Sequence, residues 1–563
     1  MNDIRRTILW VIFAFSLVML WDQWQVHNGN RPTFFPGASQ PAVTASAPAS
    51  AVPPAASAVP AATPGATAMP PGTAAPAPAA EAMARERIEV TTDVLKLVFD
   101  TEGGSVIRSE FLKHPSAEHP DQPFVLFDSS ANRVYQAQSG LIGGPFPTHK
   151  TPMKFSGERS LADGANELVL RFESPEQGGV RLIKTYTLKR GAYVIDVRHE
   201  VVNQSGQAIN PQLYVQLVRD GNKPPGESSF YSTFTGPAFY TDAKKFQKVE
   251  FSDIEKNKAE FVTSSPDGWV AMVQHYFASA WLLPDGKPRE NFARKIDQNL
   301  YAAGMITPIG AIAPGATAAV DARLFIGPQE EKVLESIAPG LELVKDYGFF
   351  TILSKPLYWL LDKLHGFIGN WGWSIVALVV LLKIAFYWFN AKAYQSMAKM
   401  KAINPKVMDM RERYKDNPQQ MQQEMMRIYR EEKVNPMGGC LPILIQIPVF
   451  IALYWVLLSS VEMRGAPWIL WIKDLSVRDP YFILPIVMTL TTLLQTALNP
   501  LPPDPMQAKL MWFMPLIFSV MFFFFPAGLV LYWITNNILT IAQQWVINTR
   551  MGVPPQFNLP KFN

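Results

Sequence analysis

The fold is decided by residues 371–389, which read WGWSIVALVVLLKIAFYWF. An α-helix of this length crosses the hydrocarbon core of a bilayer, which takes about 20 largely apolar residues. Four more apolar segments follow, at residues 439–460, 481–499, 510–525 and 528–547. The pattern therefore predicts a protein whose C-terminal part is a bundle of membrane-spanning helices.

The composition of the 563-residue chain agrees with this interpretation. Charged residues make up 17%, below the roughly 25% usual for soluble domains, and the mean hydropathy is +0.04. The single cysteine, Cys440, excludes a disulfide framework, a cysteine zinc site and an iron–sulfur cluster. Nucleotide-binding loops, paired metal ligands and nucleophile elbows are missing from the sequence. We therefore expect no enzyme, no metal, no cofactor and no DNA partner.

Residues 1–24 combine Arg5 and Arg6 with an apolar run that ends without a small-residue cleavage site. This favours an uncleaved transmembrane anchor over a cleaved signal peptide, with the two arginines in the cytoplasm. Residues 25–84 follow as a linker. Its positions 36–80 contain 18 alanines and 11 prolines and no charged residue, so we expect a disordered, semi-extended tether.

From residue 85 to residue 340 the pattern changes to short segments rich in β-branched and aromatic residues. Examples are residues 89–99 and 180–188, and Gly, Asp and Asn turns separate such segments. We predict a β-sandwich of about 250 residues outside the membrane, on the far side from Arg5. Residues 341–366 follow with apolar residues at helical spacing, which predicts an amphipathic helix at the membrane interface.

The charges of the loops predict the orientation of the helices. Residues 391–435 carry ten Lys or Arg and six Asp or Glu, whereas residues 461–480 carry three of each. The positive-inside rule places the first loop in the cytoplasm and the second outside. We therefore predict six transmembrane helices with both termini in the cytoplasm. The core spans residues 367–549 and includes a cytoplasmic helical hairpin at 391–437, and residues 550–563 form a short tail.

Lys383 is the only ionisable residue within the five C-terminal segments. A charge at bilayer depth costs about 2.5–3.5 kcal/mol on insertion scales and marks a candidate functional site. The simple alternative is snorkelling, because Lys383 lies about 9 Å from the cytoplasmic end of its segment.

Other polar residues share the depth of Lys383. Gln446, Gln495, Asn536 and Thr540 lie in the cytoplasmic halves of their segments, while the outward halves are more apolar. Hydrogen bonds between helices explain single Gln or Asn residues. They explain a cation without an acidic partner less well. A water-filled groove that is open to the cytoplasm and closed toward the outside explains both the single polar residues and the cation without an acidic partner.

The predicted hairpin carries methionines and basic residues. Asn417 and Pro418 are suited to begin its second helix. Met397, Met400, Met421 and Met425 are adaptable contacts for apolar partners, or they pack the hairpin together. Lys399, Arg411 and Arg413 are candidates to meet lipid headgroups or ribosomal RNA, although control of topology is a sufficient role for them.

Five motifs resemble the YidC membrane protein insertases of Gram-negative bacteria. They are residues 394–400 (YQSMAKM), 423–426 (QEMM), 432–440 (EKVNPMGGC), 504–506 (DPM) and 525–533 (FPAGLVLYW). The N-terminal anchor, the tether and the β-domain extend the resemblance over nearly the whole chain.

The resemblance implies a bacterial inner-membrane protein that inserts nascent membrane proteins, alone or with the Sec translocon, without ATP of its own. Lys383 lies where the family has its positively charged groove residue, most often arginine. Trp533 lies at an aromatic position implicated in client contact. The implied partners are nascent membrane proteins, the Sec translocon, the ribosome and membrane lipids. A passive assembly scaffold and a secondary transporter are the alternatives.

Overall fold

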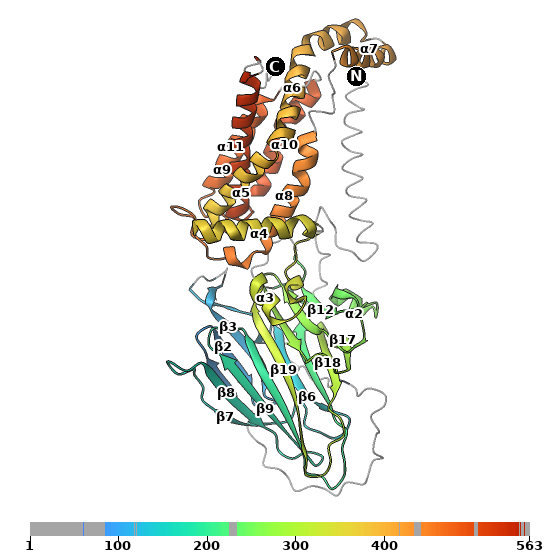
Figure 1. Ribbon diagram of the computed structural model, residues 1–563, viewed down its shortest axis with the longest axis vertical. Helices are drawn as coiled ribbons and strands as arrows, with labels where there is room; N and C mark the ends of the chain where they lie inside the picture. Colours follow the sequence, from blue (N-terminus) through green and yellow to red (C-terminus); the bar gives the residue numbers. More distant parts are fainter. Residues whose placement is uncertain are drawn as a thin grey trace, which may run out of the picture. The chain divides into compact units, whose positions relative to one another are not determined.

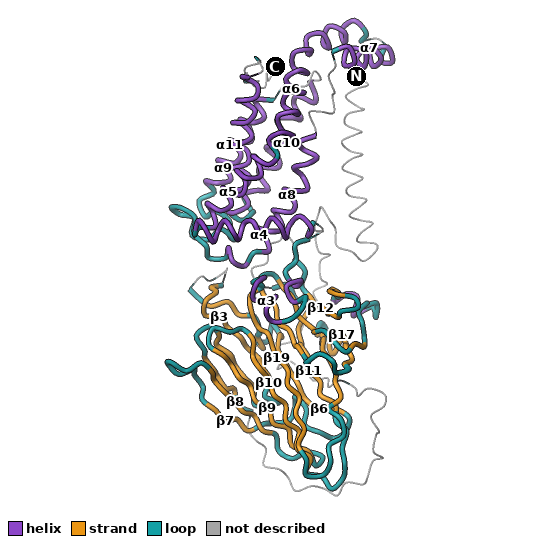
Figure 2. Tube along the Cα trace, viewed as in Figure 1, coloured by secondary structure: helices purple, strands orange, loops and turns teal. Residues whose placement is uncertain are grey.

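The computed structural model describes residues 85–116, 121–224, 233–348, 350–415, 417–432, 441–499 and 505–550, with residues 60, 119, 552 and 557. The predicted anchor at 1–24 and nearly all of the predicted linker at 25–84 lie outside the described residues. The chain divides between Asp346 and Tyr347 into two compact units. One unit is built of strands and the other of helices (Figures 1 and 2).

The N-terminal unit contains two antiparallel sheets. The first has the strand order β1-β2-β3-β6-β11-β18-β17-β14, with β4 beside β3 and β5 beside β6. The second has the order β13-β12-β15-β16-β19-β10-β9-β8-β7. The strands of the first sheet are β1 (Arg87–Thr91), β2 (Leu95–Asp100), β3 (Ser105–Pro115), β4 (Pro123–Val125), β5 (Asp128–Ser129), β6 (Val134–Ile142), β11 (Gln212–Asp220), β14 (Ser264–Ser265), β17 (Arg289–Asp297) and β18 (Leu300–Pro308). Those of the second are β7 (Lys154–Gly157), β8 (Glu167–Glu173), β9 (Val180–Lys189), β10 (Val194–Asn203), β12 (Gly236–Thr241), β13 (Lys245–Lys248), β15 (Trp269–Gln274), β16 (Phe277–Leu282) and β19 (Thr317–Pro328).

The two sheets pack face to face around one hydrophobic core. The indole N–H of Trp281 on β16 donates to the carbonyl of Gln216 on β11 at 3.1 Å, and Tyr135 on β6 hydrogen-bonds to Ser279 on β16. Fully burying a large apolar side chain contributes about 1.5–3 kcal/mol, so rings such as Trp281 stabilise the stack of sheets. The predicted β-sandwich is therefore confirmed.

Part of the second sheet is buried on both faces. On β15, Val270 and Met272 point into the core, whereas Trp269 and Ala271 belong to a second apolar cluster on the other face. That cluster includes Leu334 of helix α3 (Glu331–Ile337). The simple alternation of apolar and polar residues is lost here because both faces of the strand are covered.

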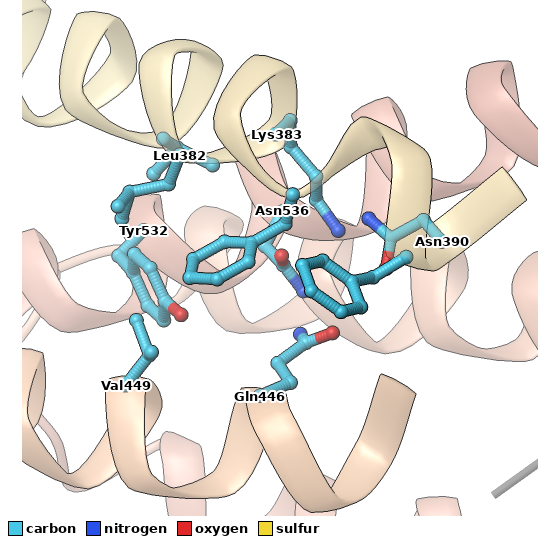
Figure 3. Close-up of a pocket in the computed structure, with 10 residues that line it drawn as sticks. Leu382, Lys383, Asn390, Gln446, Val449, Tyr532 and Asn536 are labelled. Atoms are coloured by element: carbon cyan, nitrogen blue, oxygen red, sulfur yellow. The ribbon is translucent and has the colours of Figure 1, made fainter. Parts of the chain in front are cut away.

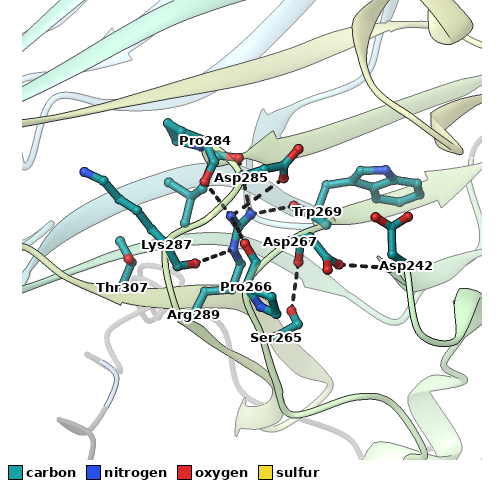
Figure 4. A network of polar contacts seen from close by, with 12 residues as sticks. Asp242, Ser265, Pro266, Asp267, Trp269, Pro284, Asp285, Lys287, Arg289 and Thr307 are labelled. Atoms are coloured by element: carbon teal, nitrogen blue, oxygen red, sulfur yellow. Dashed lines mark hydrogen bonds and ion pairs between the residues drawn. The ribbon is translucent and has the colours of Figure 1, made fainter.

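Arg289, at the start of β17, holds two loops together. Its guanidinium is buried and donates to the carbonyl oxygens of Pro266, Gly268, Leu283 and Pro284 at 2.6–3.2 Å (Figure 4). A planar group with five N–H donors suits such a ring of carbonyls, and a lysine has too few donors for it.

A second buried cation lies between the sheets. The amine of Lys184 on β9 is fully buried and donates to the carbonyls of Gly103 and Ser139 at 2.6 and 2.7 Å. His199 is paired with Lys184 in the register of β9 and β10, and its Nε2 lies 2.9 Å from the hydroxyl of Ser139. Burial lowers the pKa of Lys184 to about 7. Burial, and secondly the charge of Lys184, lower the pKa of His199 to about 3.

The C-terminal unit is helical. Its helices are α4 (Thr351–Ile368), α5 (Trp371–Ala385), α6 (Tyr387–Arg413), α7 (Pro418–Glu431), α8 (Leu441–Ser459), α9 (Ile483–Leu498), α10 (Pro505–Phe522) and α11 (Ala527–Arg550). The helix expected over 341–366 begins later, at Thr351. Residues 341–344 form instead a 3₁₀ turn whose Leu341 and Val344 are buried against the second sheet. Gly348 precedes α4 and is not helical, because its φ of +67° lies in the left-handed region.

The segment predicted at 371–389 is not one straight helix. α5 ends at Ala385, α6 begins at Tyr387, and the two helices meet at an angle of 63°. Among the described residues, no single helix is long and apolar enough to cross a bilayer alone. The bent pair of α5 and the part of α6 up to Ser396 is long and apolar enough when the two helices are taken together. The number of transmembrane helices and the domain boundaries therefore stay predictions.

We predict that the stability of the β-sandwich rises with pH between about 7 and 10.5. In this window the unfolded chain binds a proton at Lys184 and the folded chain does not, which contributes at most about 1.4 kcal/mol per pH unit. The measurement is hydrogen exchange of β9 amides in the full-length protein, corrected for the intrinsic exchange rate.

Lys184→Met removes this part of the pH slope. Lys189→Met, at the exposed end of the same strand, serves as the matched control. A slope that is equal in the wild type and in Lys184→Met contradicts the prediction.

Candidate functional site

Lys383 is held by helix α11. Its amine donates to the hydroxyl of Thr540 at 2.7 Å, and that hydroxyl donates to the carbonyl of Asn536 at 2.6 Å. The side chain of Lys383 is largely buried, with the residue 9% exposed. No carboxylate of the described residues forms an ion pair with it. The Lys383 amine is therefore hydrogen-bonded to a neutral group.

A pocket of about 470 Å³, including its open mouth, lies beside the Lys383 amine. Its polar lining comes from four helices, with Lys383 on α5, Asn390 on α6, Gln446 on α8 and Asn536 on α11 (Figure 3). The rest of the lining is apolar or aromatic and consists of Val379, Leu382, Phe386, Phe389, Val449 and Tyr532.

This lining presents two kinds of surface to one space. The cation and the three amides offer hydrogen bonds to a polar or acidic group, and the aromatic and aliphatic side chains offer apolar contact. The described residues contain no group of His, Cys, Asp or Glu able to hold a metal ion. The pocket therefore has a polar side and an apolar side.

The predicted groove residues are only partly brought together. Gln446 and Asn536 line the pocket, and Thr540 contacts it through Lys383. Gln495 lies half-buried on α9 and does not line the pocket. Trp533 does not line it either, because its ring packs edge-on against Phe450, with centroids 4.7 Å apart.

Sequence reasoning missed Asn390 and Tyr532. Asn390 was overlooked because the predicted segment ended at Phe389, although Asn390 follows Lys383 by seven residues and would share its face on one unbroken helix. Tyr532 has no such signal, since its neighbour Trp533 has the same aromatic character. The packing of α11 against α8 decides which of the two rings lines the pocket.

Further polar contacts attach α11 to α9. The side chain of Asn537 donates to the hydroxyls of Thr491 and Thr492 at 3.2 and 2.9 Å. Gln544 donates to the carbonyl of Leu498 at 3.3 Å. These bonds satisfy amides inside the bundle, which is the helix-to-helix role that the sequence left open for such residues. They join α11 to α9.

Helices α6 and α7 form the expected hairpin. The side chain of Asn417 accepts from the N–H of Gln420 at 3.2 Å, and Pro418 is the first residue of α7, as predicted. Met421 and Met425 are half-buried against the cluster of Ile403, Val407 and Met410. They therefore pack the hairpin together.

Other side chains of the hairpin are exposed. Met408 is 56% exposed and Met426 is 49% exposed. Lys399 and Arg413 are exposed, and Arg411 is half-buried. The side chains of Met397 and Met400 lie outside the described residues.

Comparison with known proteins identifies the family. The family model for the YidC periplasmic domain matches residues 87–360, and the model for the 60Kd inner membrane protein matches residues 363–553. The membrane protein insertase YidC of Cupriavidus necator is 57% identical over 551 residues, and that of Bordetella pertussis is 54% identical over 556 residues. Each match covers 98% of both chains.

A crystal structure of an active YidC insertase with its first transmembrane domain resolved is 18% identical, with a TM-score of 0.38, over 81% of this chain and 91% of that chain. The two family models together match most of the chain. The chain therefore belongs to the YidC family of membrane protein insertases, which insert proteins into the inner membrane.

Proposed function

We propose that the pocket beside Lys383 is part of a hydrophilic groove, open to the cytoplasm and to lipid, through which client segments enter the membrane. The polar flank of a client occupies the groove, where Lys383 and the neighbouring amides replace water. The apolar part of the client then leaves sideways into lipid. The groove shortens the apolar distance that the flank has to cross.

The observation that carries this proposal is the surroundings of the Lys383 amine. A structural cation in an apolar bundle needs an acidic partner or several strong acceptors to offset its desolvation. Lys383 has one hydroxyl acceptor, Thr540, and an adjoining pocket with polar groups from three other helices. Water, or the polar flank of a client, then supplies the remaining partners of the amine.

The driving force needs no nucleotide. Transfer of the client's apolar surface into lipid contributes about 25 cal/mol per Å². The membrane potential adds about 2.3 kcal/mol per charge and 100 mV, in the direction that moves acidic flanks outward. The groove therefore has to lower a barrier and does not have to supply the free energy of insertion.

We also propose a membrane topology for the chain. The chain spans the membrane six times, with both termini in the cytoplasm and the β-sandwich in the periplasm. The hairpin of α6 and α7 then lies in the cytoplasm, where it contacts emerging clients or the ribosome, and the Sec translocon acts as a partner for some clients. The loop charges and the bent pair α5–α6 support this arrangement.

We predict that Lys383→Glu lowers the insertion rate of a client with an acidic flank by about tenfold or more. Two like charges in the groove repel each other, and tenfold corresponds to about 1.4 kcal/mol of barrier. The same client with a neutral flank is expected to change much less. The assay is insertion into liposomes that contain the purified protein.

Lys383→Arg is the matched control, since it keeps the charge and is expected to stay within about threefold of the wild type. Equal insertion of the acidic client by Lys383→Glu and wild type contradicts a role for the charge. Empty liposomes provide the second control, because a passive scaffold would not raise the insertion rate above them.

We also predict an order of oxidation for the methionines of the hairpin. Mild peroxide converts exposed methionines to sulfoxides first, so Met408 and Met426 are expected to react well before Met410, which is 5% exposed. Peptide mass spectrometry of the full-length protein measures this order. A stalled client that contacts the hairpin should protect Met408 and Met426 from oxidation. Oxidation of Met410 at the same rate as Met408 and Met426 contradicts the burial of Met410 between α6 and α7.

A further inference from the structure

The side chain of Gln543 spans the break between α5 and α6. Its Nε2 donates to the main-chain carbonyl of Lys383 at 3.2 Å, and its Oε1 accepts from Nδ2 of Asn390 at 3.3 Å. One amide on α11 therefore contacts the last turn of α5 and the first turn of α6.

The break needs such a group. The final carbonyls of an α-helix have no partner within the helix and need one from another element or from water. α5 ends at Ala385, so the carbonyl of Lys383 belongs to this last turn, and the bend of 63° follows directly. Gln543 satisfies this carbonyl from outside the helix.

Lys383 is held at both ends of the residue by the same face of α11. Thr540 accepts from its amine and Gln543, three residues later, donates to its carbonyl. Residues three apart on a helix lie side by side, so the two contacts act together. Without the hydrogen bond from Gln543 to its carbonyl, Lys383 contacts this face of α11 only through its amine, at the end of a flexible four-carbon side chain.

We propose that Gln543 is a positioning residue, which fixes the α5–α6 bend and thereby directs the Lys383 amine toward the groove. This inference rests on the proposed function of the groove for its effect on clients. Its structural part, the fixation of the bend, does not depend on that function.

The first test measures the bend itself. Gln543→Met keeps the length and the helix propensity of the side chain and removes both hydrogen bonds. We expect at least threefold faster hydrogen exchange of the amides of residues 384–391 in the full-length protein. Asn548→Leu is the matched control, because Asn548 lies on the same helix and makes no side-chain hydrogen bond with any described residue. Unchanged exchange in Gln543→Met overturns the proposal.

The second test measures the direction of the amine through its effect on clients. Gln543→Met is expected to lower the insertion of an acidic-flank client at least threefold relative to a neutral-flank client. In a Lys383→Met background the same substitution should change this ratio less than 1.5-fold. An equal loss for both clients, or an effect that adds fully to that of Lys383→Met, assigns Gln543 a merely structural role and overturns the proposal.

The two tests separate this inference from the proposed function. If Lys383→Met leaves the client ratio unchanged, the role of the charge in the groove is wrong, and the exchange measurement alone then decides the role of Gln543 at the bend. Gln543→Asn keeps an amide that is one methylene shorter. It is expected to give a partial increase in exchange and replaces Gln543→Met if that variant does not accumulate.

Discussion

An ammonium group among apolar helices has to keep hydrogen-bond partners, and the helical unit is arranged around this constraint. Lys383 lies at the end of α5, where the helix breaks, and α11 presents a hydroxyl to its amine and an amide to its carbonyl. The break opens the last turn of α5 toward a pocket with polar groups from α6, α8 and α11. At Lys383 the helix is broken between α5 and α6, and the surrounding side chains are partly polar.

Lys184 and Lys383, two of the buried lysines among the described residues, show two solutions to the same problem. Lys184 is enclosed between the sheets and donates to two backbone carbonyls, and its burial lowers its pKa to about 7. Lys383 has one side-chain acceptor and adjoins an open pocket. The first arrangement belongs to a closed core, and the second leaves the cation able to accept a further partner.

Sequence reasoning reached Lys383, Gln446, Asn536 and Thr540 because polar residues in long apolar segments are conspicuous and helix geometry gives their depth. It missed Asn390, since the predicted segment and the hairpin were treated as separate elements. It included Trp533 by resemblance, whereas Tyr532 lines the pocket. Which of two adjacent rings faces a space depends on the rotation of α11 against α8, and a single helix pattern does not contain that rotation.

The sequence by itself determined the family, the division into a β-sandwich and a helical region, and the start of α7 at Pro418, because these depend on local pattern and composition. Only the tertiary structure decided the bend between α5 and α6, the packing of Met421 and Met425 inside the hairpin, and the contact between Gln543 and Lys383. Each of these depends on the distance between elements that are remote along the chain. Such distances are set by packing and by the need to satisfy buried polar groups.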